Sequence, residues 1–496
     1  MYKIGDVRNG YEVLPKKERK TILLLSDDMR MTSGVGNMSR EIVVQTVHRF
    51  NWVQIGGAIN HPDNGKNVDM NEDLTKRTGV PDCEVKIHPV NGYGDQMLVR
   101  GIMGHYNPHG IMIYTDPRFW EWLFQMEREI RTNIPIMYYN IWDDLPYPTW
   151  NQKYYDSVDS LFNISKQTVN IVKQVRSSYE PWQVTYIPHG IDETEYFPVD
   201  KSYEKYDEFL KFKSQVTRDG KKKFVVFYNA RNIRRKLPGD IVYAYRTFCD
   251  QLTEEEAAEC LLLMHCAPRD ENGTDLPALV NNLCPKYDVA FSDDKYEREQ
   301  MNWLYNCANA SILISSNEGF GLMGAETLMC GVPLIVNVSG GMQDYCGFKK
   351  EDGSYLTADD YTMEWGSNHD GRYKDHGEWV FPVWPTSRSI QGSIPTPFIS
   401  DDRPDYQDVA IQLLTAYKCG TDDLKRRGME GHKYVMNPEF GFTASEMGKR
   451  FINDIDDTLK NFKPRSRFEL TNATTYEKKL PEFNGLTNSK EIVANV

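Results

Sequence analysis

Short apolar runs alternate with helix-like stretches along most of this chain. Residues 21–25, 224–228 and 310–315 are such runs, and polar or glycine-rich turn residues bound them. A run of this length predicts a buried strand, whereas the amphipathic pattern over 38–50 predicts a helix. Strands that alternate with helices predict α/β layers with parallel sheets, which is the fold class we expect.

The length and composition provide for two such domains. The chain has 496 residues, of which 40% are hydrophobic and 26% are charged, enough for two separate cores. We expect an N-terminal domain over 1–198, a helical linker over 200–220 and a C-terminal domain over 221–441. A long helix over 442–465 follows, and the polar tail 466–496 should be loosely held.

One stretch of the C-terminal domain, 348–402, matches no regular pattern. It carries Gly, Ser and Pro clusters and is longer than connections in compact domains usually are. Its aromatic residues, among them Trp365, Trp379 and Trp384, favour an ordered insertion. We expect this insertion to shape an acceptor site or an oligomer contact.

The most informative motif lies just before a helix predicted over 322–329. Gly319 and Gly321 form a turn in which a ligand can approach the backbone closely, and the free amides of the helix's first turn favour a phosphate. Glu318 lies in the turn and Glu326 about one turn into the helix, so both carboxylates can accept hydrogen bonds from sugar hydroxyls. An ordinary helix start with a solvated second glutamate is the alternative.

The run from Glu318 to Glu326, continued by 328–335, resembles the E-x7-E signature of retaining GT-B glycosyltransferases of the sucrose-synthase and mannosyltransferase type. The match covers more than fifteen consecutive positions. The resemblance implies a GT-B fold, with two Rossmann-like domains facing across a cleft and a C-terminal helix crossing back to the N-terminal domain. It also implies that Glu318 contacts the transferred sugar and that Glu326 binds the ribose. The amides that hold the diphosphate would then be those of Gly319, Phe320, Gly321 and Leu322.

A basic segment follows the apolar run 224–228. Four cations lie within six positions there, at a predicted strand end where open α/β sheets bind ligands. The segment resembles the family element in which an arginine and, five residues on, a lysine clamp the diphosphate. The match falls on Arg231 and Lys236, which would stabilise the charge of the leaving group. Ala230 stands where the family has glycine and further arginines intervene, and a solvated basic loop is the alternative.

Two further segments complete the predicted donor site. The turn formed by Gly34, Val35 and Gly36 follows the first apolar run, and the resemblance places it opposite the donor phosphates. It lacks the third glycine of the dinucleotide fingerprint, which argues against a dehydrogenase. Phe291 and Ser292 lie in a segment that resembles the one whose backbone holds the nucleotide base.

The group that acts on the acceptor is the least determined part of the site. Trp142 stands where many family members carry a histidine. Its neighbour Asp143 is our candidate for activating the acceptor hydroxyl, with Asp144 and Asp116 as alternatives, because a carboxylate at a strand end can reach the attacking oxygen. All three aspartates also suit turn capping. His189 stands where the family usually has asparagine, and it fits a structural role as well as ligand contact.

Composition narrows the classes of partner and cofactor that we expect. The net charge of −13 argues against a surface that coats nucleic acid. The nine cysteines show neither metal-ligand spacing nor an even count, and no Asp-x-Asp motif stands out, so we expect no metal and no disulfide framework. No cofactor is expected beyond a nucleoside diphosphate sugar as co-substrate. No apolar window fits a signal peptide or a membrane span, which predicts a cytoplasmic protein. The oligomeric state stays open.

The sequence therefore predicts a retaining hexosyl- or pentosyltransferase that takes a sugar from a nucleoside diphosphate sugar without a metal. The acceptor would be a glycan, a protein, a small molecule or, as a minority case, a modified base in DNA, as for viral glucosyltransferases. Two alternatives remain. One is another GT-B activity, such as a nucleotide-sugar epimerase or hydrolase. The other is a non-catalytic nucleotide-sugar-binding protein, for which Trp142 is the motivating feature.

Overall fold

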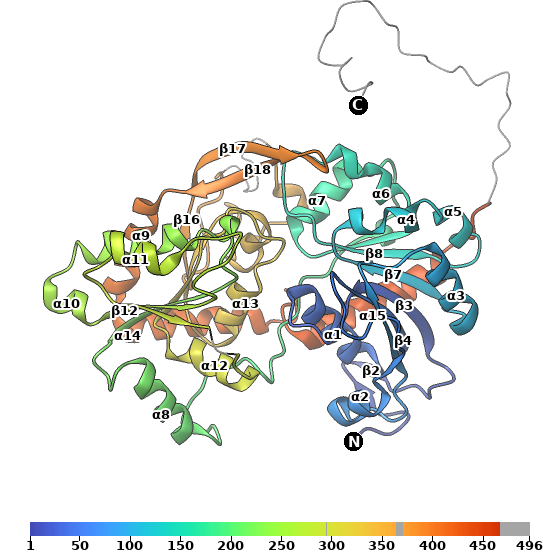
Figure 1. Cartoon of the computed structure of the whole chain (residues 1–496), viewed down its shortest axis with the longest axis horizontal. Helices are drawn as coiled ribbons and strands as arrows, with labels where there is room; N and C mark the ends of the chain where they lie inside the picture. The colour runs from blue at the N-terminus through green and yellow to red at the C-terminus, as the bar shows by residue number, and fades with distance from the viewer. Residues whose placement is uncertain (294, 364–370, 467–496) are drawn as a thin grey trace, which may run out of the picture.

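The computed structural model describes residues 1–293, 295–363 and 371–466. In these residues the chain forms two α/β halves that lie side by side, each built around its own sheet (Figure 1). Two of the sequence predictions concern the tail beyond residue 466 and Trp365, and both of these lie outside the described residues. The predicted two-sheet α/β architecture is confirmed.

The N-terminal sheet has the spatial strand order β10-β9-β8-β7-β3-β4-β6-β5. Its neighbours pair in parallel, except that the edge strand β5 runs antiparallel to β6. The strands are β3 (Lys20–Asp27), β4 (Phe50–Ala58), β5 (Val68–Asp69), β6 (Val85–Asn91), β7 (Gly110–Tyr114), β8 (Ile136–Asn140), β9 (Ser160–Asn163) and β10 (Val184–Tyr186). The inner strands are apolar on both faces, as expected for a parallel sheet that helices cover on both sides.

The helices of this half connect successive strands. They are α1 (Gly34–Thr46), α2 (Asn71–Thr78), α3 (Gln96–Tyr106), α4 (Glu121–Phe124), α5 (Glu127–Ile130), α6 (Gln152–Asp156) and α7 (Lys166–Val175), with 3₁₀ turns at Pro117–Trp120, Thr149–Asn151 and Pro181–Gln183. Helix α1 begins earlier than predicted, because the Ser33 side chain caps it by accepting a hydrogen bond from the Gly36 amide. Before the sheet, β1 (Val7–Arg8) and β2 (Tyr11–Glu12) form a small antiparallel pair.

The C-terminal sheet is parallel throughout and has the strand order β13-β12-β11-β14-β15-β16. Its strands are β11 (Phe224–Asn229), β12 (Cys260–His265), β13 (Val289–Ser292), β14 (Ala310–Leu313), β15 (Leu334–Asn337) and β16 (Val380–Val383). The helices of this half are α8 (Tyr206–Val216), α9 (Pro238–Cys249), α10 (Glu254–Ala258), α11 (Leu276–Leu283), α12 (Arg298–Cys307), α13 (Leu322–Met329) and α14 (Tyr406–Met436). Short 3₁₀ turns lie at Arg234–Lys236, Gly340–Tyr345 and Ala358–Asp360.

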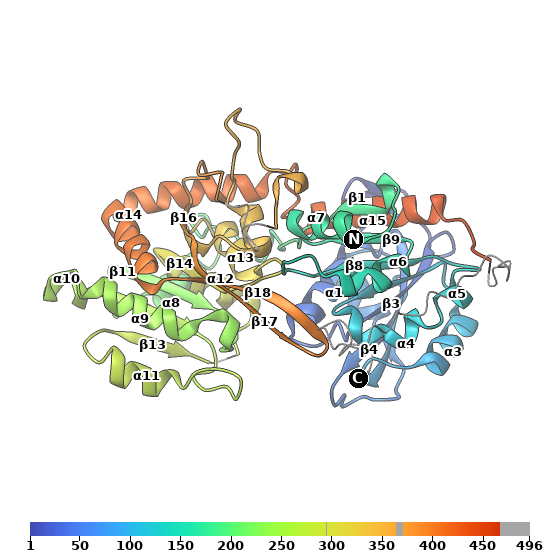
Figure 2. The same cartoon turned by 90° about the horizontal axis from the view of Figure 1, so that it is seen from above.

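The last helix, α15 (Ala444–Asn461), crosses back from the C-terminal half to the N-terminal half, as predicted (Figure 2). It packs on α1 so closely that a Cβ atom added to Gly448 would lie 2.6 Å from the Cβ of Gln45. The two halves are therefore joined by a second chain crossing, in addition to the linker between β10 and α8.

The stretch 348–402 showed no regular pattern in the sequence, but part of it forms regular strands. Val380–Val383 forms β16, the edge strand of the C-terminal sheet, and an edge position tolerates its Pro382. A long antiparallel hairpin follows, made of β17 (Pro385–Ser393) and β18 (Thr396–Pro404). In both views this hairpin reaches from the C-terminal half toward the N-terminal half (Figures 1 and 2).

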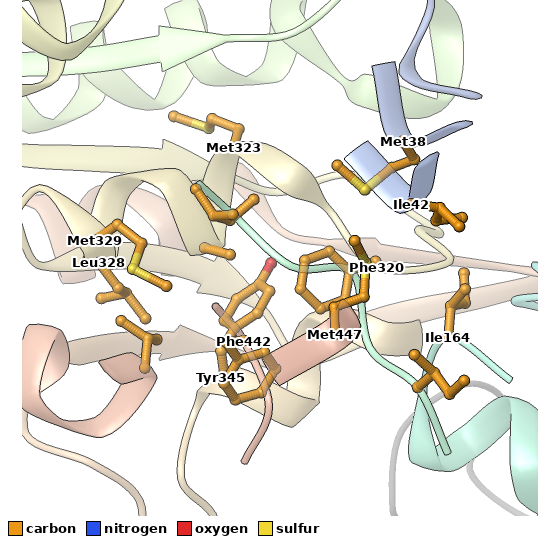
Figure 3. Packing of buried hydrophobic residues seen from close by; sticks show 14 of the residues in the cluster. Met38, Ile42, Ile164, Phe320, Met323, Leu328, Met329, Tyr345, Phe442 and Met447 are labelled. Atoms are coloured by element: carbon orange, nitrogen blue, oxygen red, sulfur yellow. The ribbon is translucent and has the colours of Figure 1, made fainter. Parts of the chain in front are cut away.

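The two halves share a continuous apolar cluster beneath the cleft. Figure 3 shows Phe320, from the turn before α13, in the same cluster as Met38 and Ile42 of α1 and Met447 of α15. Because Phe320 is only 2% exposed, the turn is anchored from below. The structure thus has the two halves in contact at the segment that the sequence singled out.

Candidate active site

A cavity of about 1070 Å³ lies between the two halves, at the carboxyl ends of strands from both sheets. Most of the residues predicted from the sequence line it. These are Gly34, Val35, Asp143, Arg231, Lys236, Glu318, Gly319, Phe320, Gly321, Leu322 and Glu326. Gly36, Phe291 and Ser292 are not among the lining residues.

The turn between β14 and α13 has the backbone geometry that its glycines suggested. Gly321 has a φ of +79°, a left-handed conformation that favours glycine. A Cβ atom on Gly319 would lie 2.6 Å from the Ile164 side chain and 2.9 Å from the Ile141 carbonyl, so the turn runs against the N-terminal half. Leu322 and Met323, the first residues of α13, line the cavity, so their backbone amides are placed to donate hydrogen bonds to an anion.

Two glycines that the sequence analysis overlooked support this turn from behind. A Cβ atom on Gly341 would lie 1.9 Å from the Gly319 carbonyl oxygen, and one on Gly340 would lie 2.4 Å from that of Glu318. The Gly341 amide donates a 2.8 Å hydrogen bond to the Glu318 carbonyl. Paired glycines after a strand signal close backbone approach, and that signal could have marked them.

Glu318 is held by two cations that follow β11, the strand beside β14 in the same sheet. Its carboxylate forms ion pairs with Lys236 and, at 3.1 Å, with Arg235. Burial alone would raise the pKa of Glu318, but the positive charges of Lys236 and Arg235 outweigh that effect and lower it to about 2. Glu318 is therefore a fixed carboxylate beside the phosphate-binding turn.

Of the two arginines at issue, both line the cavity, but Arg235 rather than Arg231 contacts Glu318. Arg235 also donates a 2.7 Å hydrogen bond to the Asn317 carbonyl. The Arg231 side chain is 66% exposed and pairs with Asp270 at 2.8 Å, at the cavity rim. Lys236 lies where the sequence analysis expected it, whereas Arg235 was noted only as one of the intervening arginines.

Glu326 lines the same cavity and belongs to a short hydrogen-bond chain. The Tyr305 hydroxyl donates to its carboxylate, and the Asn229 amide donates to the Tyr305 hydroxyl at 2.9 Å. Burial raises the pKa of Glu326, and the Tyr305 hydrogen bond opposes that rise. Tyr305 and Asn229 thus orient a carboxylate that is able to accept hydroxyl hydrogen bonds, and neither residue was expected from the sequence.

On the N-terminal side, Gly34 and Val35 face the cavity from the start of α1. Gly36 has a different role, because a Cβ atom there would lie 2.8 Å from the carbonyl oxygens of Asp28 and Met31. It lets the loop before α1 pack tightly and does not itself line the cavity. The side chain of Ser33, which caps the helix, is in turn held by Asp27 at 2.6 Å.

Phe291 and Ser292 lie at the end of the edge strand β13, separated from the glycine turn by β12 and β11. With strands roughly 5 Å apart, this places them roughly 15 Å along the sheet from the end of β14. Ser292 lies 3.1 Å from a ring nitrogen of His265, whose ring packs against Tyr296. Their role in holding a base stays a prediction, and the two rings add a stacking surface nearby.

The acid pair Asp143 and Asp144 lines the cavity beside Arg235. Burial raises the pKa of both groups, and for Asp144 the neighbouring Asp143 charge raises it further. The rise is larger for Asp144, because the two neighbouring carboxylates repel each other when both are charged. Asp116 also lines the cavity, but it both caps a 3₁₀ turn and pairs with Arg118.

Trp142 and His189 line the cavity too, and both have internal partners. The Trp142 indole donates to the Asp144 carbonyl at 2.8 Å. The Tyr139 hydroxyl donates to the Ile187 carbonyl, so it accepts from His189 Nδ1 at 2.7 Å, while Tyr114 donates to Nε2. Burial lowers the pKa of His189 to about 3, so it is neutral and its ring nitrogens are engaged, which favours a structural role.

No group of three or more His, Cys, Asp or Glu in residues 1–293, 295–363 and 371–466 is arranged to hold a metal ion. Within the same residues, no helix is both long enough and apolar enough to cross a membrane.

Residues 207–375, which include the glycine turn and both glutamates, match the model of a family described as Family 4 Glycosyltransferase in conflict systems. This segment is similar to glycosyltransferase family 4. The family 4 segment thus supplies the C-terminal wall of the cavity, including Lys236, Glu318 and Glu326. No curated protein matches the chain in sequence.

Solved structures resemble most of the chain, well beyond the family 4 segment. HepE of Anabaena in complex with UDP and glucose has a TM-score of 0.60 at 12% identity, over 88% of this chain and 100% of that one. The sucrose-phosphate synthase of Thermosynechococcus elongatus has a TM-score of 0.59 at 14% identity, over 89% and 100%. The α,α-trehalose-phosphate synthase (UDP-forming) of Burkholderia vietnamiensis has a TM-score of 0.55 at 11% identity, over 89% and 99%. These likenesses confirm the predicted GT-B fold.

Proposed function

We propose that this protein is a retaining glycosyltransferase that moves a hexosyl or pentosyl group from a nucleoside diphosphate sugar, bound in the cavity, to an acceptor hydroxyl. One observation carries the proposal. The Glu318 carboxylate, the cations Lys236 and Arg235 and the glycine turn all line one wall of the same cavity.

These groups suit the two ends of the donor. Backbone amides at the start of α13 and the two cations bind a diphosphate, and their charge stabilises the negative charge that develops on it as the leaving group. The carboxylates of Glu318 and Glu326 accept hydrogen bonds from hydroxyls and would repel phosphate, so Glu318 serves the transferred sugar and Glu326 the ribose. The UDP and glucose bound by HepE of Anabaena make UDP-glucose the first donor to test.

In the transfer, the bond between the sugar C1 and the diphosphate oxygen breaks, and the nucleoside diphosphate leaves with the electron pair. The acceptor oxygen forms the new bond to C1 and loses its proton. Asp143 serves this step as base, and the nearby Arg235 balances its charge. We infer retention of the anomeric configuration from the resemblance of the run Glu318 to Glu326 to the E-x7-E signature.

The test is release of nucleoside diphosphate from UDP-, GDP- and ADP-sugars, with and without added acceptors. We expect wild-type protein to release it and Glu318→Gln to lose at least about a hundredfold in rate. Glu378→Gln is the matched control, because Glu378 pairs with Arg426 at the surface and does not line the cavity. Binding without release would support a non-catalytic nucleotide-sugar-binding protein, and no binding of any nucleotide sugar would refute the proposal.

A further inference from the structure

The hairpin β17–β18, which we call the strap, is rooted in the C-terminal half. At its base the Asn337 side-chain amide donates to the Asp402 carbonyl at 3.0 Å, and the Asn317 amide donates to the Ser400 carbonyl at 2.9 Å. Asn337 ends β15 and Asn317 belongs to the glycine turn, so the strap is held against the donor wall itself.

The same strap is latched to the N-terminal half through residues of β18. The Ser400 amide donates to the Leu145 carbonyl at 2.6 Å, and Arg118 donates to the Thr396 hydroxyl. The ring of Phe398 packs edge-on against Trp150, with centroids 4.5 Å apart. Polar and apolar contacts therefore fix the strap across the space between the halves.

The inner side of the strap faces the cavity with polar side chains. Gln391, Asp401 and Arg403 line the cavity together with Thr396 and Ile399. The Gln391 amide and the Arg403 guanidinium both donate to the Asp401 carboxylate, at 2.7 and 2.8 Å. Carboxylates and amides oriented in this way are suited to binding hydroxyl groups.

The strap meets the N-terminal strand ends on the acceptor side of the proposed reaction. Arg118, which latches Thr396, pairs with Asp116 after β7, and Leu145, which accepts from Ser400, follows Asp143 and Asp144 after β8. The proposed base thus lies between the donor wall and the strap. A sugar ring in this space would also meet the indole of Trp142.

We propose that the strap forms a wall of the acceptor subsite and selects a small polyhydroxylated acceptor, a mono- or disaccharide or a polyol, over a polymer. This inference rests on the glycosyltransferase function proposed above. The cavity, about 1070 Å³, lies at the top of the range of roughly 300–1,000 Å³ common for small-molecule pockets, which suits small ligands better than a polymer. Because the strap is latched on both halves, a polymer that approaches Asp143 from the side of the strap has to displace it.

The experiment uses full-length protein with UDP-glucose, or whichever nucleotide sugar the wild type cleaves. The acceptor panel contains D-glucose, D-mannose, maltose, glycerol and myo-inositol as small hydroxyl compounds, with dextran and duplex DNA as polymers. We expect small compounds to accelerate release of the nucleoside diphosphate. Asp401→Asn and Gln391→Ala should raise the KM of the acceptor about tenfold while the KM of the donor stays within twofold.

Two further variants keep the inference falsifiable if Asp401→Asn folds poorly. Ser387→Ala lies on the exposed strand β17 outside the cavity lining and should match the wild type in every parameter. Phe398→Ala, which loosens the latch, should raise the ratio of dextran to glucose transfer at least fivefold. Acceleration by polymers alone or by no small compound, or unchanged acceptor KM in both cavity variants, overturns the strap proposal. Failure of the wild type to cleave any nucleotide sugar instead refutes the proposed function.

Discussion

Lys236 and Glu318 form a largely buried ion pair in the proposed donor site, although 82 positions separate them in the chain. Lys236 follows β11 and Glu318 follows β14, two strands that are neighbours in the parallel sheet. The pair keeps Glu318 ionised. It also links the cation proposed to bind the donor's diphosphate to the carboxylate proposed to bind the donor's sugar. A diphosphate that attracts Lys236 also changes the field at the carboxylate that faces the sugar.

The placement of the basic residues predicts unequal effects of two neighbouring arginines. Arg235→Gln removes a cation that contacts Glu318 and should lower kcat/KM about a hundredfold. Arg231→Gln removes an exposed rim residue that pairs with Asp270, and it should lower kcat/KM by less than about tenfold because exposed pairs contribute little. Steady-state kinetics on both variants measures the difference. The reverse order would mean that the arginine marked by the family resemblance is the one that clamps the diphosphate.

The hydrogen bond from Tyr305 to Glu326 predicts an effect on donor affinity. Tyr305→Phe leaves the carboxylate without its hydroxyl donor, so the KM of the donor should rise about tenfold with a smaller change in kcat. Tyr228→Phe is the matched control, because the Tyr228 hydroxyl is buried and has no hydrogen-bond partner in the described part of the chain. An equal effect of the two substitutions would show that loss of the hydroxyl acts through folding rather than through Glu326.

Buried neutral histidines predict a loss of stability in mild acid. Burial lowers the pKa of His189 and of His48 to about 3, below the usual value of about 6.5, so the unfolded chain binds more protons between these values. Stability is therefore complete above about pH 6.5 and falls as the pH drops toward 3.

The test is the unfolding free energy from urea titrations at pH 7 and pH 5. In His189→Asn the drop between the two pH values should be smaller than in the wild type by about 2 kcal/mol. His105→Gln, a change at an exposed position, should keep the wild-type drop. An unchanged drop in His189→Asn would contradict the neutral, buried state of His189.

The sequence predicted the helix after the glycine turn well because its signals are local. Gly321 before the helix and Gly331 after it bound α13 at Leu322–Met329, as expected from the pattern. The choice between Arg231 and Arg235 was beyond the sequence, because the 3₁₀ turn Arg234–Lys236 decides which of several adjacent cations contacts Glu318. Tyr305 was missed for a similar reason, since its hydroxyl, on α12, meets Glu326, on α13, only in the folded chain.

The strap was also beyond the sequence. Strand β17 is exposed from Thr386 to Ser393, so it lacks the alternation of apolar and polar residues that predicts a half-buried strand. The order of the strap comes from contacts of β18 with Asn317, Leu145 and Trp150, which are distant in the chain. A pattern read along the sequence carries no information on such partners.

The most direct test of the donor site is calorimetric titration of wild-type protein and Lys236→Met with UDP, GDP and ADP and with the matching monophosphates. The account predicts that at least one diphosphate binds the wild type. Its affinity should fall at least tenfold in Lys236→Met, about 1.4 kcal/mol, while the monophosphate changes less than threefold. Equal affinity of the diphosphate for both proteins, or no binding of any nucleotide to the wild type, would contradict the assignment of the cavity as a nucleotide-sugar site.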